Sequence, residues 1–310
     1  MNREIVAKLE QRLGIDPARQ RIDIEEAHKA QIFGQGRSFF HIENWYSVHS
    51  LIRNILRLCL MYRKGQRNAR RIQVRYNSIK LPGLHADFNG FTILHLSDLH
   101  ADMDDKATLA LMECIREVDY DICVMTGDYR ARTYGDIQPS LAAMARVRVH
   151  LQKQVYAVLG NHDSILMVPA LEEMGIQVLI NEHTLIKRGQ GSLVLAGIDD
   201  AHYLCVDNIP KTAAGLTEHT PSILLSHTPA VYKQAAKAGF DLMLSGHTHG
   251  GQICLPGGIP IVLDSDCPRF VGNGRWHYNK MQGYTSVGSG TSVVNVRINC
   301  LPEITLHRLT

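Results

Sequence analysis

The sequence predicts a soluble α/β protein, and three observations support this class. From residue 90 onward, short apolar runs alternate with segments of helical periodicity. Several of these runs end in Asp, Asn or His. The composition, with 45% hydrophobic and 20% charged residues among 310, excludes a disordered chain, a collagen-like repeat and a multi-span membrane protein. The seven cysteines are odd in number and form no Cys-x-x-Cys pair, which is typical of reduced thiols.

The first 90 residues differ from the rest of the chain in charge. Residues 1–90 carry 16 Lys and Arg against 8 Asp and Glu, whereas residues 91–310 carry 17 against 22. Met1–Arg12 has helical character, and Ile24–Ala30 is too mixed to interpret. We therefore expect two domains, a basic helical extension over residues 1–90 and a main domain over residues 91–310.

A basic amphipathic helix is predicted within the extension. Residues 51–80 carry nine basic side chains and no acidic one. One interpretation is a helix lying on an anionic membrane, with Phe40, Trp45 and Tyr46 at headgroup level. The other is a helix packed on the main domain with a solvated basic face. Nucleic acid is a less favoured partner, because no aromatic residues are interleaved with the arginines. The apolar positions with helical spacing are Val48, Leu51, Ile52, Ile55, Leu58, Cys59 and Tyr62.

The sequence predicts neither a membrane span nor a signal peptide. Arg53, Arg57 and Arg63 interrupt the amphipathic segment, which is far short of the roughly 20 apolar residues that a span needs. Met1–Gly14 has no apolar core of the kind found in signal peptides. We expect a cytoplasmic protein, with the inner face of the membrane as a candidate location.

In the main domain, each of five predicted strands is followed by residues of types that commonly bind metals. Helices over Lys106–Val118 and Pro139–Leu151 separate the first three strands. Because α/β sheets bind ligands at the carboxyl ends of their strands, we expect these residues to meet at one rim. The strands are Phe91–Leu96, Ile122–Thr126, Val155–Leu159, Ile223–Ser226 and Phe240–Ser245. The residues that follow them are Asp98, His100, Asp128, Asn161, His227, His247 and His249.

The chemistry of these residues indicates a metal centre. Carboxylate, amide oxygen and imidazole suit Mn, Fe, Zn or Co, and the lack of Cys disfavours a structural zinc site. A centre of two metals about 3.5–4 Å apart needs a carboxylate that can bridge them. Such a centre polarises a phosphoryl group and activates water.

The order of these motifs resembles the calcineurin-like metallophosphoesterase superfamily over residues 91–310. Later segments resemble its bacterial phosphodiesterase branch, which includes UDP-2,3-diacylglucosamine pyrophosphatases. The resemblance implies a four-layer αββα sandwich behind the N-terminal helical extension. The main motifs are Asp98-x-His100, Gly127-Asp128, Gly160-Asn161-His162-Asp163, Ser226-His227 and Gly246-His247-Thr248-His249. The later segments are Gly250-Gly251-Gln252, Val287–Thr291 and Pro302-Glu303-Ile304.

The resemblance also implies roles for individual residues. Asp128 would bridge two divalent metals, with manganese favoured, and a hydroxide between the metals would attack phosphorus. His162 would face the phosphate without binding metal, as the catalytic residue that assists the leaving oxygen. In protein phosphatases an Asp that orients this histidine stands where this chain has Ala131, so the orienting group is left open. The first metal would be held by Asp98, His100, Asp128 and His249, and the second by Asp128, Asn161, His227 and His247.

The substrate is expected to be a phosphate diester or pyrophosphate. The amphipathic helix favours a lipid-linked substrate such as UDP-2,3-diacylglucosamine. Arg130, His202 and Arg269 lie in or beside loops between the motifs and are the candidate substrate-binding residues. The alternatives are a phosphodiesterase for a soluble nucleotide or related diester, and a scaffold of the same fold without catalysis.

Overall fold

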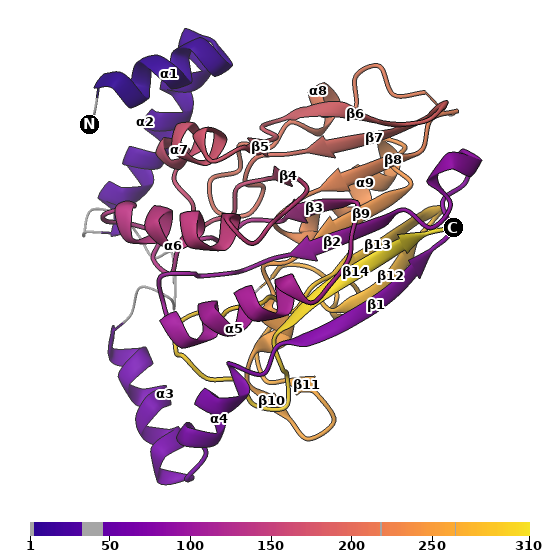
Figure 1. The fold of residues 1–310 in the computed structure, drawn as a ribbon. Helices are drawn as coiled ribbons and strands as arrows, with labels where there is room; N and C mark the ends of the chain where they lie inside the picture. Colours follow the sequence, from indigo (N-terminus) through magenta and orange to yellow (C-terminus); the bar gives the residue numbers. More distant parts are fainter. Residues whose placement is uncertain (1–2, 33–45, 218, 264) are drawn as a thin grey trace.

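The computed structural model describes residues 3–32, 46–217, 219–263 and 265–310. Two six-stranded sheets face each other (Figure 1). The first sheet has the order β1-β14-β2-β3-β4-β5, and the second has the order β12-β13-β9-β8-β7-β6. The first is formed by β1 (Gln73–Ile79), β2 (Thr92–Leu96), β3 (Ile122–Met125), β4 (Gln154–Ala157), β5 (Ile176–Val178) and β14 (Glu303–Leu309). The second is formed by β6 (Glu182–Arg188), β7 (Gly191–Gly197), β8 (Ser222–Leu225), β9 (Leu242–Ser245), β12 (Gly274–Tyr278) and β13 (Met281–Thr285).

Helices cover the outer face of each sheet. On the first sheet these are α5 (Asp105–Arg116), α6 (Gln138–Arg148) and α7 (Val168–Glu173), and on the second they are α8 (Ile209–Thr212) and α9 (Tyr232–Lys237). A third apolar cluster fills the space between the sheets. The expected αββα sandwich is therefore confirmed. Short 3₁₀ turns occur as η2 (Ala86–Phe88), η3 (Ile165–Met167), η4 (Pro229–Val231), η5 (His249–Gly251) and η6 (Arg269–Val271).

The alternation along β3 explains why this apolar run forms a central strand. Cys123 and Met125 point into the core beneath the helices, whereas Ile122 and Val124 point into the core between the sheets. A strand that is buried on both faces needs apolar residues at every position. The expected strand ends at residues 96, 126, 159, 226 and 245 agree with the observed ends within two residues.

The beginning of the chain forms two helix pairs. The first pair is α1 (Arg3–Leu13) and α2 (Ile15–Ile32), and the second pair is α3 (Tyr46–Leu58) and α4 (Tyr62–Asn68). Leu9 and Ile22 of the first pair join the core beneath α5, α6 and α7. The segment 24–30, which had no sequence interpretation, is part of α2.

The amphipathic segment is two helices, so the prediction of one continuous helix over 48–62 is wrong. Leu60 adopts a φ of 56° and interrupts the segment. After this break α4 turns toward the domain, where Gly65 lies against Val296 and Ile298. Leu56 of α3 is buried in the same contact. Phe40 and Trp45 lie outside the described residues, as do the side chains of Tyr46 and Val48.

The two-domain division stays a proposal. Residues 73–79 form β1, which pairs in parallel with β14 in the first sheet. The expected boundary at residue 90 therefore follows a strand that belongs to the sandwich. Within the described ranges, none of the helices is both long and apolar enough to cross a membrane.

Candidate metal centre

The seven residues expected to bind metal all lie at one edge between the sheets, and all seven are buried. The ends of β2, β3 and β4 contribute Asp98, His100, Asp128 and Asn161. The ends of β8 and β9 contribute His227, His247 and His249. Within these sets, Asp98, His100 and His249 form one group whose ligand atoms lie within 4.8 Å of one another. Asp128, His227 and His247 form a second group by the same measure.

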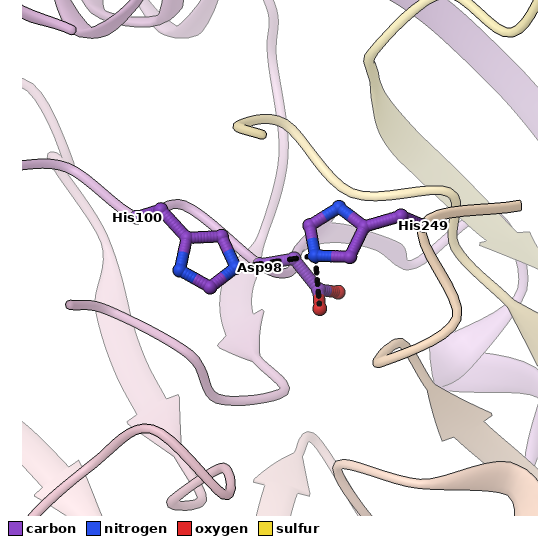
Figure 2. A group of neighbouring side chains, drawn as sticks. All are labelled: Asp98, His100 and His249. Atoms are coloured by element: carbon purple, nitrogen blue, oxygen red, sulfur yellow. Dashed lines mark hydrogen bonds and ion pairs between the residues drawn. The ribbon is translucent and has the colours of Figure 1, made fainter. Parts of the chain in front are cut away.

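The first group is drawn in Figure 2, where dashed lines join His249 to Asp98 and to His100. His249 Nε2 lies 3.5 Å from Asp98 Oδ1 and 3.1 Å from His100 Nε2. The Asp98 carboxylate also accepts the backbone N–H of His247, at 3.1 and 3.0 Å from its two oxygens. A backbone N–H group of the loop after β9 thus binds Asp98, the ligand candidate that follows β2.

The second group extends to the first through one carboxylate. His227 Nε2 lies 3.3 Å from Asp128 Oδ2, 2.9 Å from Asn161 Oδ1 and 3.2 Å from His247 Nδ1. The same Asp128 Oδ2 is 3.7 Å from His100 Nε2. Asp128 therefore stands between the two groups, as a shared ligand must.

Two imidazoles are held so that their Nε2 atoms face the site. His100 Nδ1 donates to the carbonyl oxygen of Arg130 at 2.8 Å, and His227 Nδ1 donates to that of Thr126 at 2.7 Å. Metal-binding histidines commonly donate their other N–H to a carbonyl or carboxylate, which fixes the ring and its tautomer. This geometry suits metal coordination.

The backbone at the site is unusual. Five of the seven ligand candidates are non-glycine residues with positive φ. This conformation costs free energy and persists where the surrounding structure enforces it, often at functional sites. Gly246 has no room for a Cβ, because the side chains of Ser97 and Asp98 lie too close to it. The five are Asp98 (50°), His100 (39°), Asp128 (58°), His247 (71°) and His249 (50°).

The site favours a positive charge beside Asp128. Burial alone would raise the pKa of Asp128, but His227, His162 and His100 together outweigh burial and hold that pKa well below its usual range. Burial alone would lower the pKa of His227, but Asp128 raises it to about 10. Burial lowers the pKa of His247 and His249 well below the usual range, so both rings are neutral. Neutral imidazole is the form that binds metal.

His162, the expected catalytic residue, lies in the same cluster, where its ligand atom is within 4.8 Å of those of His100 and Asp128. Its Nε2 is 3.9 Å from Asp128 Oδ2, and its Nδ1 donates to the carbonyl oxygen of Ala131 at 3.1 Å. The residue that replaces the orienting Asp of protein phosphatases therefore orients His162 through its backbone. Side-chain identity could not predict this contact, since every residue has a carbonyl group.

The three expected substrate-binding residues differ in position. Arg130 is buried, its Nε donates to the carbonyl oxygen of His162, and its Nη2 has no partner among the residues described. The His202 ring lies 4.2 Å from the His247 ring, measured between centroids. Arg269 is exposed in η6 and forms no side-chain hydrogen bond or ion pair within the described part of the chain. The structure thus brings Arg130 and His202 to the cluster but gives no such contact for Arg269.

Two residues that organise the site had no predicted role. The Asp163 carboxylate accepts the backbone N–H groups of Asp128, Tyr129 and Gly160 at 2.7, 2.9 and 2.9 Å. Arg297 is fully buried and donates to the carbonyl oxygen of His249 at 3.1 Å. Asp163 could have been found inside the Gly-Asn-His-Asp motif. Arg297 lies between apolar residues and outside the motifs, so the sequence did not indicate its role.

A buried chain of five hydrogen bonds leads to Asp98 from β1. Because a carboxylate accepts, Ser97 must donate to it, and each earlier donor then follows in the same direction. Both imidazoles in the chain are therefore neutral with the proton on Nε2, and burial lowers the pKa of His95 to about 3. The bonds are Asn77 Nδ2 to His307 Nδ1 (2.9 Å), His307 Nε2 to His95 Nδ1 (3.3 Å), His95 Nε2 to Thr126 Oγ1 (2.9 Å), Thr126 Oγ1 to Ser97 Oγ (2.7 Å) and Ser97 Oγ to Asp98 Oδ2 (2.6 Å).

The αββα sandwich and the buried carboxylate, amide and imidazole groups at its edge define a metal-dependent phosphoester hydrolase. Residues 91–251 match the family described as calcineurin-like phosphoesterase, and the chain belongs to this family. The candidate His and Asp clusters are consistent with the divalent metals that this family uses.

Bacterial relatives match most of the chain. An uncharacterized metallophosphoesterase, YkoQ of Bacillus subtilis (strain 168), is 32% identical over 79% of this chain and 93% of its own length. The phosphodiesterase YaeI of Escherichia coli (strain K12) is 30% identical over 71% of this chain and 82% of its own length. A second uncharacterized metallophosphoesterase of Bacillus subtilis (strain 168), YkuE, is 28% identical over 77% of this chain and 85% of its own length. These relatives agree with the bacterial phosphodiesterase branch expected from the sequence.

Proposed function

We propose that this protein hydrolyses a phosphodiester or pyrophosphate bond at a centre for two divalent metals. The observation that carries the proposal is the position of the Asp128 carboxylate, 3.7 Å from His100 Nε2 and 3.3 Å from His227 Nε2. One ligand set would be Asp98, His100, Asp128 and His249, and the other Asp128, Asn161, His227 and His247. Metals held there would supply Lewis acidity toward the phosphoryl oxygens and lower the pKa of water.

The residues present fit such metals. The donors are carboxylate and amide oxygens and imidazole nitrogens, with no thiolate, and this mixture suits Mn, Fe, Zn or Co, of which manganese is the proposed ion. The buried Nε2 of His247 has no partner within the described ranges. A polar atom in that state costs free energy unless a ligand satisfies it.

His162 and Arg130 would act on the substrate. His162 is the proposed general acid, because its Nδ1–H is held by Ala131 and its Nε2 is directed toward Asp128. The imidazolium form of histidine, which carries a proton on both ring nitrogens, is suited to donate its Nε2 proton to a leaving oxygen near neutral pH. The unpartnered Nη2 of Arg130 would bind a phosphate oxygen. His202 is proposed to contact the substrate from its position against His247. Arg269, exposed in η6, is proposed as a further substrate contact.

We further propose a lipid-linked substrate, such as UDP-2,3-diacylglucosamine, which would be cleaved to UMP and the lipid monophosphate. Support comes from α3, where Leu51, Ile55 and Leu58 are 59%, 50% and 83% exposed. These side chains recur at helical spacing, and the neighbouring Arg53 and Arg57 are also exposed. An exposed apolar stripe with basic neighbours suits an anionic membrane surface, here the inner face of the membrane.

A second exposed apolar group supports the same proposal. It lies on the hairpin β10 (Cys254–Leu255) and β11 (Ile259–Pro260) and on the residues that follow. Ile253, just before this hairpin, packs against the same cluster as Leu56 of α3 and Tyr62 of α4, and Figure 1 shows these elements at one end of the molecule. The hairpin also follows η5, which carries His249. The exposed side chains are Leu255, Ile259, Ile261 and Val262.

A phosphorus NMR time course tests the reaction and the substrate together. The purified protein with Mn²⁺ is incubated with UDP-2,3-diacylglucosamine in detergent, and a generic diester serves as the comparison. Release of UMP well above the rate for the diester supports the lipid-linked substrate. Turnover of the diester alone keeps the hydrolase and leaves a soluble nucleotide or related diester as the substrate class. No turnover of either, with stoichiometric metal bound, contradicts the proposed reaction.

Binding to vesicles tests the membrane surface separately. The variant Leu51→Ser/Leu58→Ser is compared with Val149→Ser/Leu185→Ser, which alters two exposed apolar residues on other elements. We expect the first variant alone to lose sedimentation with vesicles that contain anionic lipid. Point variants are preferred to deletion of residues 1–80, because that deletion would remove β1 from the first sheet.

A further inference from the structure

We propose that Arg21 and Glu25 of α2 are positioning residues for the hydrolytic centre, because they hold the two loops that carry His162 and His202. The N-terminal helix pair would thus be part of the active site. The inference rests on the proposed function in assigning His162 to the leaving group.

Glu25 holds the loop that follows His162. Its carboxylate accepts the hydroxyl of Ser164, and its Oε2 accepts the backbone N–H of Ile165 at 3.0 Å. Ser164 and Ile165 are the second and third residues after His162 and begin the turn η3. A shift of Glu25 would therefore move the backbone from which His162 projects.

Arg21 connects the same helix to the second loop. Its Nε donates to Asp199 Oδ2 at 2.7 Å and its Nη2 to Asp199 Oδ1 at 3.4 Å, a two-point contact. Its Nη1 donates to Glu25 Oε2 at 3.3 Å. Arg21, Glu25 and Asp199 are only 5%, 7% and 3% exposed. One buried set of charges therefore joins α2 to both loops.

The Asp199 loop brings His202 to the metal centre. Asp199 Oδ1 accepts the backbone N–H of Asp200 at 2.8 Å. The Asp200 carboxylate in turn accepts the backbone N–H groups of His202, Tyr203 and Leu204 at 3.0, 2.9 and 2.6 Å. These bonds fold the loop so that the His202 ring lies 4.2 Å from that of His247. The path from Arg21 to the cluster is continuous.

Helix docking alone does not require these charges. Leu9, Ala18 and Ile22 already attach the helix pair to the apolar core. A buried ion pair is often no more stabilising than apolar side chains of similar size, because both charges lose their hydration. The charged groups add specific contacts to two separate loops, since Glu25 fixes the backbone N–H of Ile165 and Arg21 fixes the carboxylate of Asp199.

The test uses Glu25→Gln, which keeps the size of the side chain but removes one of its two acceptor oxygens. If Glu25 positions His162, kcat/KM falls more for a diester with a poor alkoxide leaving group than for one with p-nitrophenolate. We expect the difference between the two losses to be about tenfold or more, since general acid catalysis matters most when the leaving group needs a proton. Ser164→Ala removes the hydrogen bond from Ser164 to Glu25 by changing the donor. It replaces Glu25→Gln in the test if that variant folds poorly.

Arg12→Gln is the matched control. Arg12 also pairs with two carboxylates, Glu172 and Glu182, but these attach the helix pair to the outer edge of the sandwich. We expect this control to lower the melting temperature without changing the preference between the two leaving groups. Equal losses on both diesters in Glu25→Gln, or the same change of preference in Arg12→Gln, would overturn the proposal.

Imidazole NMR of the metal-free protein gives a readout that does not depend on turnover. The ring signals of His162 and His202, assigned by substitution, should shift in Glu25→Gln and in Arg21→Lys but not in Arg12→Gln. Unchanged ring signals would overturn the positioning role even if neither diester is hydrolysed. Shifted signals in a protein without hydrolase activity would retain the positioning role and reject the proposed function.

Discussion

The two sheets bring different chemistry to the shared site. The first sheet supplies every oxygen donor, through Asp98, Asp128 and Asn161, together with His100. The second sheet supplies only imidazoles, His227, His247 and His249. The shortest contact between an imidazole and an oxygen ligand candidate joins the two sheets, with His227 Nε2 lying 2.9 Å from Asn161 Oδ1. Neither half contains a complete site, so the metal centre depends on how the sheets are packed.

Support for the ligands also differs between the halves. On the first sheet, Asp98 ends a chain of hydrogen bonds that begins with Asn77 on the edge strand. On the second sheet, His227 is held by the backbone carbonyl of Thr126, just after β3, and His249 is held by the buried Arg297. Asp98 therefore depends on a longer series of side chains than His227 does.

The largest effect is expected where the two halves meet. Asp128→Asn keeps the size of the side chain but removes the charge that both groups share. We expect kcat to fall by several orders of magnitude, because the electrostatic contribution of a preorganised site is large. Steady-state kinetics and metal analysis measure the effect, and circular dichroism checks the fold. Near-wild-type turnover would contradict the role of Asp128.

His162→Ala and His227→Ala separate a catalytic imidazole from a ligand. His162→Ala should lose about 10²–10⁴-fold in kcat, the usual contribution of a general acid, while retaining bound metal. His227→Ala should lose metal as well as activity, since its Nε2 lies 3.3 Å from Asp128 Oδ2 and 2.9 Å from Asn161 Oδ1, among the proposed ligand atoms. Metal content is measured after dialysis against trace Mn²⁺. Equal metal loss in both variants would show that His162 is also a ligand.

Ser97→Ala and Ser226→Ala compare corresponding positions in the two sheets. Each serine directly precedes a ligand candidate, but Ser97 donates to Asp98 itself, whereas Ser226 donates to the carbonyl oxygen of Thr228. We expect Ser97→Ala to weaken metal binding by about 10–100-fold, the usual effect of losing a group that supports a ligand. Ser226→Ala should change the affinity less. Calorimetric titration with Mn²⁺ measures both affinities, and equal effects would contradict the role of Ser97 in supporting Asp98.

The smallest predicted effect concerns pH and the buried His95. Its pKa is lowered from 6.5 to about 3 by burial, so the unfolded chain binds a proton that the folded chain does not. The contribution of neutral His95 to stability is therefore complete above pH 6.5 and is lost as the pH falls toward 3. Urea unfolding of the metal-free protein at pH 7.5 and about 4.5 measures this loss. His95→Gln should reduce the pH dependence, and an unchanged dependence would contradict the burial effect.

Several parts of the fold followed from local patterns, and others did not. The five strands that end at the site and the helices α5 and α6 were predicted because apolar periodicity and terminal residues mark them. The edge strand β1 was missed, because its exposed Arg75 and Tyr76 break the apolar pattern. The single helix over 48–62 was predicted because its periodicity continues across Leu60, whereas packing of Gly65 against Val296 requires a turn.

The sequence alone determined the α/β class, the residues with metal-binding chemistry and the family resemblance, because each depends on neighbours in the chain. Only the tertiary structure decided what holds those residues. Arg21 and Asp199 are 178 positions apart, and the partner of His162 is a backbone carbonyl that any residue at position 131 would supply. Contacts of this kind depend on which distant segments the two sheets bring together. They therefore cannot be predicted from the pattern of neighbouring residues in the sequence.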